Sequence, residues 1–263
     1  MSVSDCASLA GNATKITARG FGWTHAGRSE PALSDIDVVI EPGERVLLCG
    51  DSGSGKSTLL AAMAGVLGSE EEGTRTGEIL LEDSTGLVEE PGHTIPVGLV
   101  LQDPDSQVIS ARVGDDIAFG CENLAYPREE IWRRVTAAKE LVGPFVDLDF
   151  PTERLSGGQK QRLALAGVIA MGAGVVLLDE PTANLDPAGA RDVVRAVSRL
   201  VEETGATLVV VEHQHAAWDG VLDRAVELDR GRIVADTSFA EVAQRRQVSG
   251  LPQARRLSEA ELA

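Results

Sequence analysis

The sequence is short of basic residues and has no long apolar run, and each shortage excludes a class of protein. Its 24 Lys and Arg residues against 41 Asp and Glu residues leave a net charge of −17, which repels nucleic-acid phosphates and anionic lipid surfaces. Since no run of about 18 apolar residues is present, we expect no membrane-spanning helix. We therefore expect no nucleic-acid partner, and membrane attachment only through another protein.

Cysteine is also scarce. Cys6, Cys49 and Cys121 are far apart and form no CxxC pattern, which fits reduced thiols better than a disulfide framework or a zinc site. The segment MSVSDCASLAGNATK has neither the basic start nor the apolar stretch of a secretory signal, so we expect a cytosolic chain. A hydrophobic content of 43% over 263 residues can fill the core of one large α/β domain or two small ones.

The strongest motif present is GDSGSGKST, which fits the pattern GxxxxGK[ST] between the strand-like run ERVLLC and an expected helix ending at Gly68. Such a loop can wrap its N–H groups around a phosphate. Lys56 would reach the β- and γ-phosphates, and the Ser57 hydroxyl would ligate Mg²⁺. The alternative is a glycine-rich turn without a ligand. The predicted nucleotide-binding residues are Gly50, Asp51, Ser52, Gly53, Ser54, Gly55, Lys56, Ser57 and Thr58.

Two adjacent acids, Asp179 and Glu180, follow the apolar run VVLL, which is typical of a buried parallel strand. The carboxyl end of such a strand delivers side chains into a ligand site. Asp179 would hold Mg²⁺, and Glu180 would polarise an attacking water as general base. The alternative is a solvated acidic turn. Upstream, RLSGGQKQRLALAGVIAMG is predicted to form an amphipathic helix, with Ser156 as its N-cap.

The order and spacing of four motifs resemble the nucleotide-binding subunit of ATP-binding-cassette (ABC) transporters. These motifs are the GDSGSGKST of residues 50–58, called the P-loop, the LSGGQ of residues 155–159, called the signature, the LLDEP of residues 177–181 and the NLD ending at Asp186. The resemblance implies an α/β fold with a P-loop NTPase core, a mainly parallel sheet, an antiparallel β subdomain and an inserted helical subdomain. It places one nucleotide-binding domain at residues 16–235, the helical subdomain at about 103–153 and a tail at 236–263. Within the subdomain, the apolar face of PREEIWRRVTAAKELVG predicts one helix between Pro127 and Gly143. ATP and Mg²⁺ are the implied cofactors, and ATP hydrolysis is the implied activity.

The resemblance also assigns roles to residues outside the P-loop. Gln102 would be a switch residue that contacts Mg²⁺ and the attacking water, and His213 would contact the γ-phosphate, with His215 as the competing candidate. ATP in this family is sandwiched between the P-loop of one subunit and the signature of another, so a second ABC ATPase subunit, identical or paralogous, is the implied partner. The residues implied to complete a neighbouring chain's site are Ser156, Gly157, Gly158, Gln159 and Asp186.

The adenine position departs from the family pattern, which usually has an aromatic F-x-Y ahead of the P-loop. In FGWTHAGRSEPAL, Trp23 stands at the phenylalanine place and His25 at the tyrosine place. Both remain candidates for stacking on the base, and Trp23 alternatively belongs to the core. In the tail, arginines 245, 246, 255 and 256 are interpreted as a solvated end or, less favoured, as an aid to dimer contact.

The stretch QDPDSQ followed by AFGCEN is similar to the ATPases of energy-coupling-factor importers. That subfamily takes up vitamins or transition-metal ions through a transmembrane coupling subunit and a substrate-binding membrane protein, which places the chain at the cytoplasmic face of the membrane. The alternatives are the ATPase of another ABC transporter or a soluble ABC ATPase outside transport. The residues that carry the similarity are Gln107, Asp116, Ala118, Phe119, Gly120, Glu122 and Asn123.

Overall fold

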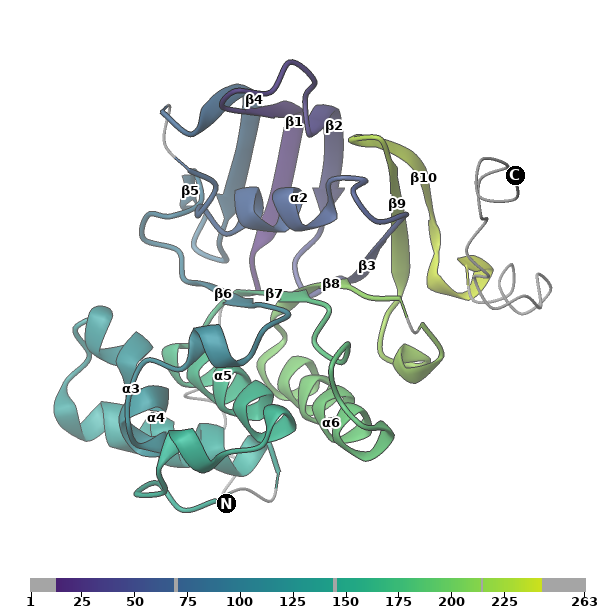
Figure 1. Ribbon diagram of the computed structural model, residues 1–263. Helices are drawn as coiled ribbons and strands as arrows, with labels where there is room; N and C mark the ends of the chain where they lie inside the picture. Colours follow the sequence, from purple (N-terminus) through teal and green to yellow (C-terminus); the bar gives the residue numbers. More distant parts are fainter. Residues whose placement is uncertain (1–12, 69–70, 144–145, 214, 243–263) are drawn as a thin grey trace.

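The computed structural model describes residues 13–68, 71–143, 146–213 and 215–242, and Figure 1 shows two β-sheets with a group of helices. The strands are β1 (Lys15–His25), β2 (Leu33–Ile40), β3 (Arg45–Cys49), β4 (Gly73–Glu82), β5 (Val88–Glu89), β6 (Val97–Val100), β7 (Val175–Asp179), β8 (Thr207–Val211), β9 (Arg224–Asp229) and β10 (Arg232–Ser238). The α-helices are α2 (Lys56–Met63), α3 (Val113–Asn123), α4 (Arg128–Leu141), α5 (Gly157–Met171) and α6 (Pro187–Thr204). Short 3₁₀ turns are η1 (Asp105–Gln107), η2 (Thr152–Arg154) and η3 (His215–Trp218).

The larger sheet has six strands in the order β10-β9-β3-β8-β7-β6. Its neighbouring pairs are parallel except for the antiparallel hairpin of β9 and β10. Side chains along β7 alternate between two cores: Val175 and Leu177 pack with the smaller sheet and α2, whereas Val176 and Leu178 pack with the helices. A strand covered on both faces must be apolar throughout, which is why VVLL shows no polar alternation. The predicted mainly parallel sheet is confirmed.

The smaller sheet is antiparallel and has the order β2-β1-β4-β5. It joins strands from both sides of the P-loop in sequence, since β1 and β2 precede the loop and β4 and β5 follow it. Figure 1 shows this sheet and α2 on one side of the larger sheet, and α3 to α6 on the other. Within the described residues, no helix combines the length and the apolar character needed to cross a membrane.

The inserted region contains two α-helices, not the single helix expected at residues 127–143. The additional helix is α3, whose Val113, Ile117 and Cys121 recur at a spacing of four and are fully buried. This spacing lines one helical face, so the signal was present in the sequence. Both helices pack against α5, which carries LSGGQ at its start. The signature is therefore attached to the helical part of the molecule.

One expected boundary shifts in the structure. The P-loop helix α2 ends at Met63, short of Gly68, because Gly65 and Val66 donate backbone hydrogen bonds to Ala62 and Ala61 in a tightened turn. At the other end of the domain, β10 continues past residue 235, and Asp236 still pairs with β9. The tail arginines lie outside the described residues.

Candidate functional site

The predicted catalytic residues come together at one edge of the larger sheet. Neighbouring parallel strands β3, β8, β7 and β6 end there, and they are followed respectively by the P-loop, His213, Glu180 and Gln102. Asp179 is the last residue of β7 and pairs with Val211 at the end of β8. Carboxyl ends of parallel strands are where open α/β sheets bind ligands, so this edge is the candidate active site.

The P-loop is held by its own lysine. Lys56 is only 6% exposed, and its Nζ donates to the backbone carbonyls of Gly50 at 3.0 Å and Asp51 at 2.8 Å. These two bonds join the end of the loop to its start and satisfy the hydrogen-bonding needs of a buried ammonium group. Gly55 caps the following helix α2 at a φ of 103°, so Lys56 is the first residue of that helix. A helix N-terminus behind a closed loop of N–H groups suits a phosphate.

Gly50 and Gly53 give the loop a testable steric requirement. Gly50 has a φ of 137°, and a Cβ there would lie 2.1 Å from the Leu228 carbonyl oxygen. Gly53 has a φ of 79°, but a Cβ there would meet nothing within 4 Å. We expect Gly53→Ala to cost about 1–2 kcal/mol of unfolding free energy from backbone strain alone. We expect Gly50→Ala to cost about 2–5 kcal/mol, because steric overlap adds to the strain. Urea denaturation of both variants measures the difference, and equal losses would contradict it.

Asp179 and Ser57 form the second element of the site. The Ser57 hydroxyl donates a hydrogen bond to the Asp179 carboxylate, so the P-loop helix and the end of β7 are in contact here. Burial raises the pKa of the Asp179 carboxyl above its usual range, while this hydrogen bond and the nearby Lys56 ammonium oppose the rise. A partly buried carboxylate beside a hydroxyl offers hard oxygen ligands to a small divalent cation.

The raised pKa of Asp179 makes a prediction about stability and pH. The folded state disfavours the ionised form, so the contribution of Asp179 to stability is fully present below its unfolded pKa and is lost as pH rises through its folded pKa. Asp179→Asn keeps an acceptor for Ser57 but never ionises. Without nucleotide, we expect this variant to have the larger unfolding free energy at pH 7, with the gain vanishing below about pH 3.9. Urea denaturation at several pH values measures it. The exposed Asp219→Asn is the control, and a constant difference across pH would contradict the prediction.

Glu180 lies between the other two predicted catalytic side chains. Its Oε2 accepts from Gln102 Nε2 at 3.0 Å, and its Oε1 lies 3.0 Å from His213 Nε2. Glu180 has a φ of 47°, in the left-handed region that a non-glycine residue rarely adopts, and its N–H donates to the Val211 carbonyl at 2.9 Å. Such strain is typical of functional sites. His215 is buried and bonds to the Glu212 carbonyl oxygen, so the structure places His213, not His215, against Glu180.

The segment around Gln102 is supported by a second glutamine. Gln107 accepts from the Leu101 N–H at 2.9 Å and donates to the Leu101 carbonyl at 3.1 Å, which holds the residue before Gln102 from both sides. On α5, Gln161 also donates to the Leu101 carbonyl, and Lys160 pairs with Asp105. Gln107 is one of the residues that carry the similarity to energy-coupling-factor ATPases. In the structure, its two hydrogen bonds hold the backbone next to Gln102.

The signature residues line a separate cavity of about 410 Å³. Ser156 and Gln159 form a capping box at the start of α5, and Ser156 and Gly157 are exposed. Asp186 caps α6 by accepting from the Gly189 N–H at 2.7 Å. The lining residues come from segments 156–162 and 184–192, with no contribution from the P-loop within the described part of the chain. They are Ser156, Gly157, Gly158, Gln159, Arg162, Asn184, Leu185, Asp186, Ala188, Gly189 and Asp192.

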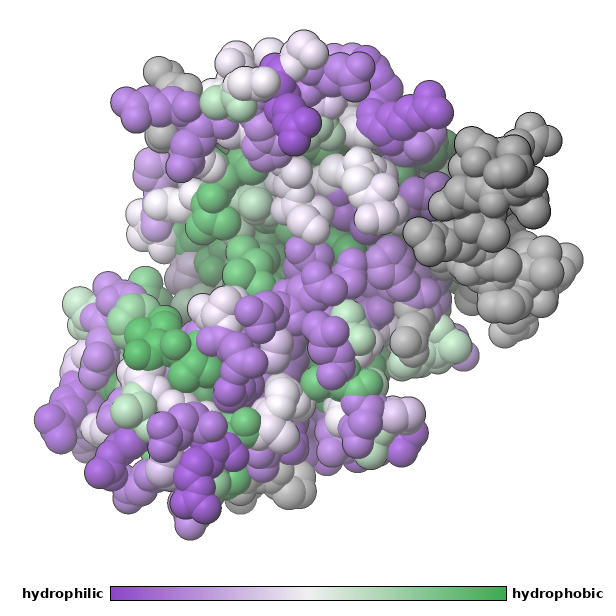
Figure 2. All heavy atoms as spheres, viewed as in Figure 1, coloured by the Kyte–Doolittle hydropathy of each residue, from purple (hydrophilic) through white to green (hydrophobic). Residues whose placement is uncertain are grey.

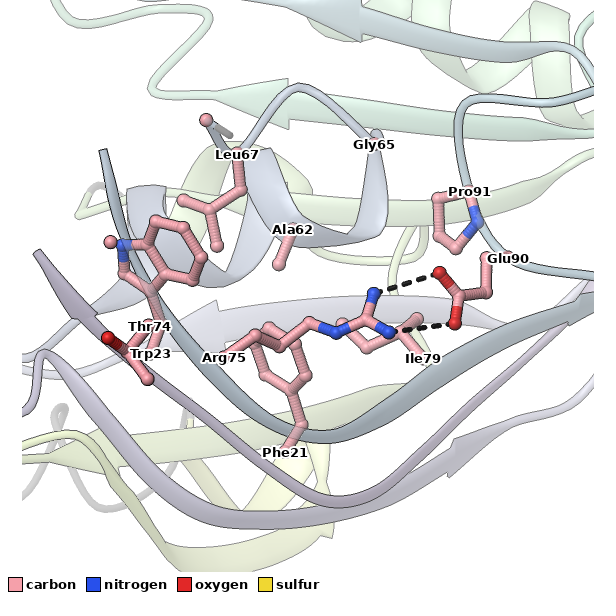
Figure 3. Close-up of a pocket in the computed structure, with 12 residues that line it drawn as sticks. Phe21, Trp23, Ala62, Gly65, Leu67, Thr74, Arg75, Ile79, Glu90 and Pro91 are labelled. Atoms are coloured by element: carbon pink, nitrogen blue, oxygen red, sulfur yellow. Dashed lines mark hydrogen bonds and ion pairs between the residues drawn. The ribbon is translucent and has the colours of Figure 1, made fainter. Parts of the chain in front are cut away.

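The two adenine candidates differ in exposure. Trp23 is 4% exposed and packs in the core of the smaller sheet, where its Nε1 donates to His25 Nδ1 at 3.1 Å. Figure 3 shows its ring on the wall of a pocket of about 720 Å³ between β1, β4 and the end of α2, with the ion pair of Arg75 and Glu90 opposite. The P-loop turn does not line this pocket among the described residues. His25 is exposed, so its ring is accessible to a ligand, and base stacking by either residue stays a prediction.

Known proteins with similar sequences are ATP-binding proteins of ABC transporters. The family model for ABC transporters matches residues 33–183. A putative ABC transporter ATP-binding protein of Methanosarcina acetivorans is 39% identical over 85% of this chain, but the match covers 35% of that relative, so the chain spans about a third of its length. The energy-coupling factor transporter ATP-binding protein EcfA1 of Caldanaerobacter subterraneus is 40% identical over 82% of this chain and 76% of that protein.

Solved structures show the same fold. CbiO1 of Clostridium perfringens, described as part of the ABC transporter complex cbiONQ, has a TM-score of 0.75 and 31% identity, over 90% of this chain and 93% of that one. The ATP-binding cassette MJ0796, solved as a dimer in a post-hydrolysis state with ADP and Pi, has a TM-score of 0.68 at 22% identity, over 85% of this chain and 98% of that one, and supports the fold alone. Because the family model covers more than half of the sequence, the chain belongs to the ABC transporter family and carries the ATP-binding cassette of that family.

Proposed function

We propose that this chain is the ATP-hydrolysing subunit of a membrane importer of the energy-coupling-factor type, which takes up a vitamin or a transition-metal ion. The similarity to EcfA1 over 76% of that protein supports the subfamily, and so does the likeness to CbiO1. The observation that carries ATP hydrolysis is the placement of the Glu180 carboxylate between Gln102 and His213, beside the P-loop. The subunit would act at the cytoplasmic face of the membrane, held there by protein partners.

In this proposal Glu180 accepts the proton of the attacking water. The hydrogen bond from Gln102 and the contact with His213 orient its carboxylate. When ATP binds, Lys56 exchanges its hydrogen bonds to the loop carbonyls for bonds to the β- and γ-phosphates. Ser57, Asp179 and Gln102 offer hydroxyl, carboxylate and amide oxygens, the ligand type that Mg²⁺ prefers, so these residues would hold that ion. When bound, Mg²⁺ neutralises charge on the transferred phosphate.

The separate signature cavity supports pairing of two cassettes. Ser156, Gly158 and Asp186 present ordered polar groups in a cavity that the P-loop of the same chain does not line, within the described residues. A second P-loop with its ATP, from an identical or paralogous chain, fits this cavity and would be completed by it. ATP would close the pair because its γ-phosphate contacts both halves, and hydrolysis would release them.

Apolar side chains on the helical part support a membrane-protein partner. Ile109 is 61% exposed, and Phe119 and Trp132 also face solvent. Figure 2 shows apolar patches on this part of the molecule, among mostly polar side chains. Exposed apolar groups rimmed by polar residues are typical of protein interfaces. They belong to the inserted region, where a transmembrane coupling subunit is expected to dock.

Co-purification of membrane proteins tests the proposal. A tagged Glu180→Gln chain would be expressed in its native host and purified from membranes solubilised in mild detergent with Mg-ATP. Lys56→Met, which we expect to bind ATP poorly, is the comparison. Recovery of a helical coupling subunit with a small substrate-binding membrane protein is the expected result. Recovery of a conventional permease would replace the subfamily and keep the transporter ATPase. Recovery of no membrane protein from either chain would overturn transport and favour a soluble ABC ATPase.

A further inference from the structure

Glu212 is a buried carboxylate in the first turn beyond β8. It is 3% exposed, and the strand that precedes it, residues 207–211, is buried throughout. A carboxylate removed from water is strongly disfavoured unless hydrogen bonds replace its hydration. Its partners therefore explain why an acid occupies this position.

Both carboxylate oxygens of Glu212 accept hydrogen bonds from the loops at the active edge. Oε1 accepts from the hydroxyl of Thr182, and Oε2 accepts from the backbone N–H of His213 at 2.8 Å. Thr182 is 4% exposed and lies in the turn that begins at Glu180, where the Ala183 N–H donates to the Glu180 carbonyl at 3.1 Å. One side chain thus connects the loop after β7 with the loop after β8.

The same two loops carry Glu180 and His213, whose side chains are 3.0 Å apart. The connection through Glu212 lies behind this contact and fixes the backbone of His213, while the His213 ring is half exposed at 46%. A half-exposed ring on an unrestrained loop would sample several rotamers. The contact between His213 and Glu180 joins the two loops, and so do the hydrogen bonds of Glu212. Together these interactions restrict the rotamers of the His213 ring.

We propose that Glu212 is a positioning residue, which holds His213 in reach of Glu180 and of the phosphate bound at the P-loop. The inference rests on the proposed ATP hydrolysis but not on the type of transporter. Glutamine cannot replace the acid fully, because its amide NH₂ is a donor and would face one of the two donors, the Thr182 hydroxyl or the His213 N–H. The proposal therefore predicts that charge-neutral, isosteric Glu212→Gln misplaces His213.

Combining Glu212→Gln with His213→Ala shows whether Glu212 acts through His213 or only stabilises the fold. We expect Glu212→Gln to lower kcat about 10-fold with a change in Kd for Mg-ATP of less than about 2-fold, since misplacement weakens the reaction more than binding. In a His213→Ala background, the same substitution should lower kcat no further. Multiplicative losses in the double variant, or an unchanged kcat in the single variant, would overturn the proposal. The exposed Glu203→Gln on α6 is the matched control for loss of one acidic charge.

Thr182 provides a second route in case Glu212→Gln folds poorly. Thr182→Val removes the hydroxyl donor and should lower kcat, whereas Thr182→Ser keeps the hydroxyl and should recover most of the rate. Equal rates for the Val and Ser variants would contradict the role of the hydroxyl. Thermal unfolding of each variant shows whether a loss of rate follows a loss of fold.

A readout without hydrolysis keeps this inference separate from the proposed function. The NMR signals of the His213 imidazole should shift when Glu180 is changed to glutamine, because the two side chains are in contact. That response should disappear in the Glu212→Gln background if Glu212 positions the ring, and should persist if it does not. A chain that hydrolyses no ATP, yet shows the response and its loss, would overturn the proposed function and leave the positioning role standing.

Discussion

Glu180→Gln is expected to slow ATP hydrolysis by at least about 10²-fold, the lower end for loss of a general base. Glutamine has the size of glutamate and can keep a hydrogen bond to Gln102 or His213, so the site retains its shape. Its amide cannot accept the proton of the attacking water, however, so the chemical step loses its base. Affinity for Mg-ATP should remain within a few-fold of the original chain, since the phosphate-binding groups are unchanged.

Steady-state phosphate release measures the rate, and titration with a fluorescent ATP analogue measures binding. Glu203→Gln, an exposed change on α6, is the matched control and should keep the original rate. Near-normal turnover in Glu180→Gln would refute the role of Glu180 as base. Loss of binding together with turnover would instead show that the substitution damaged the nucleotide site.

Lys56→Met is expected to weaken binding of Mg-ATP by at least about 10²-fold. The lysine would exchange its two bonds to neutral loop carbonyls for bonds to anionic phosphate oxygens, which are stronger because both partners are charged. A factor of 10² corresponds to about 2.8 kcal/mol for that difference. Methionine has a similar length and no charge. Hydrolysis should fall below detection at Mg-ATP concentrations that saturate the original chain.

Ligand-induced stabilisation gives an independent measurement of the same effect. Saturating Mg-ATP should raise the Tm of the original chain, because a ligand that binds only the folded state stabilises it, and should leave the Tm of Lys56→Met unchanged. Lys139→Met on α4 is the matched control, since Lys139 lies in the helical part of the molecule, where its Nζ pairs with Asp147 at 3.9 Å. A similar rise in Tm for Lys56→Met and Lys139→Met would contradict the assignment of Lys56.

Motifs that are continuous in the chain were predictable because their chemistry is local. The strand, glycine turn and helix around Lys56, the apolar strand before Asp179 and the N-cap at Ser156 each depend on neighbours within a few residues. Where the local signal was weaker, the prediction failed. The helix α3 was missed although Val113 and Ile117 begin its buried face, and the end of α2 was placed too late because apolar residues continue beyond Met63.

Residue types and motif order were sufficient to assign the family, the P-loop and the acids at the strand end, since these patterns encode phosphate binding and burial directly. The tertiary structure alone decided which side chains meet. Gln102 and Glu180 are 78 residues apart and come within hydrogen-bond distance only because β6 and β7 lie side by side in the sheet. The pairing of β8 with β7 likewise brings His213, and not His215, against Glu180, and the packing of the folded chain buries Trp23 and Glu212. Burial and contact depend on distant segments and leave no mark on the neighbouring sequence.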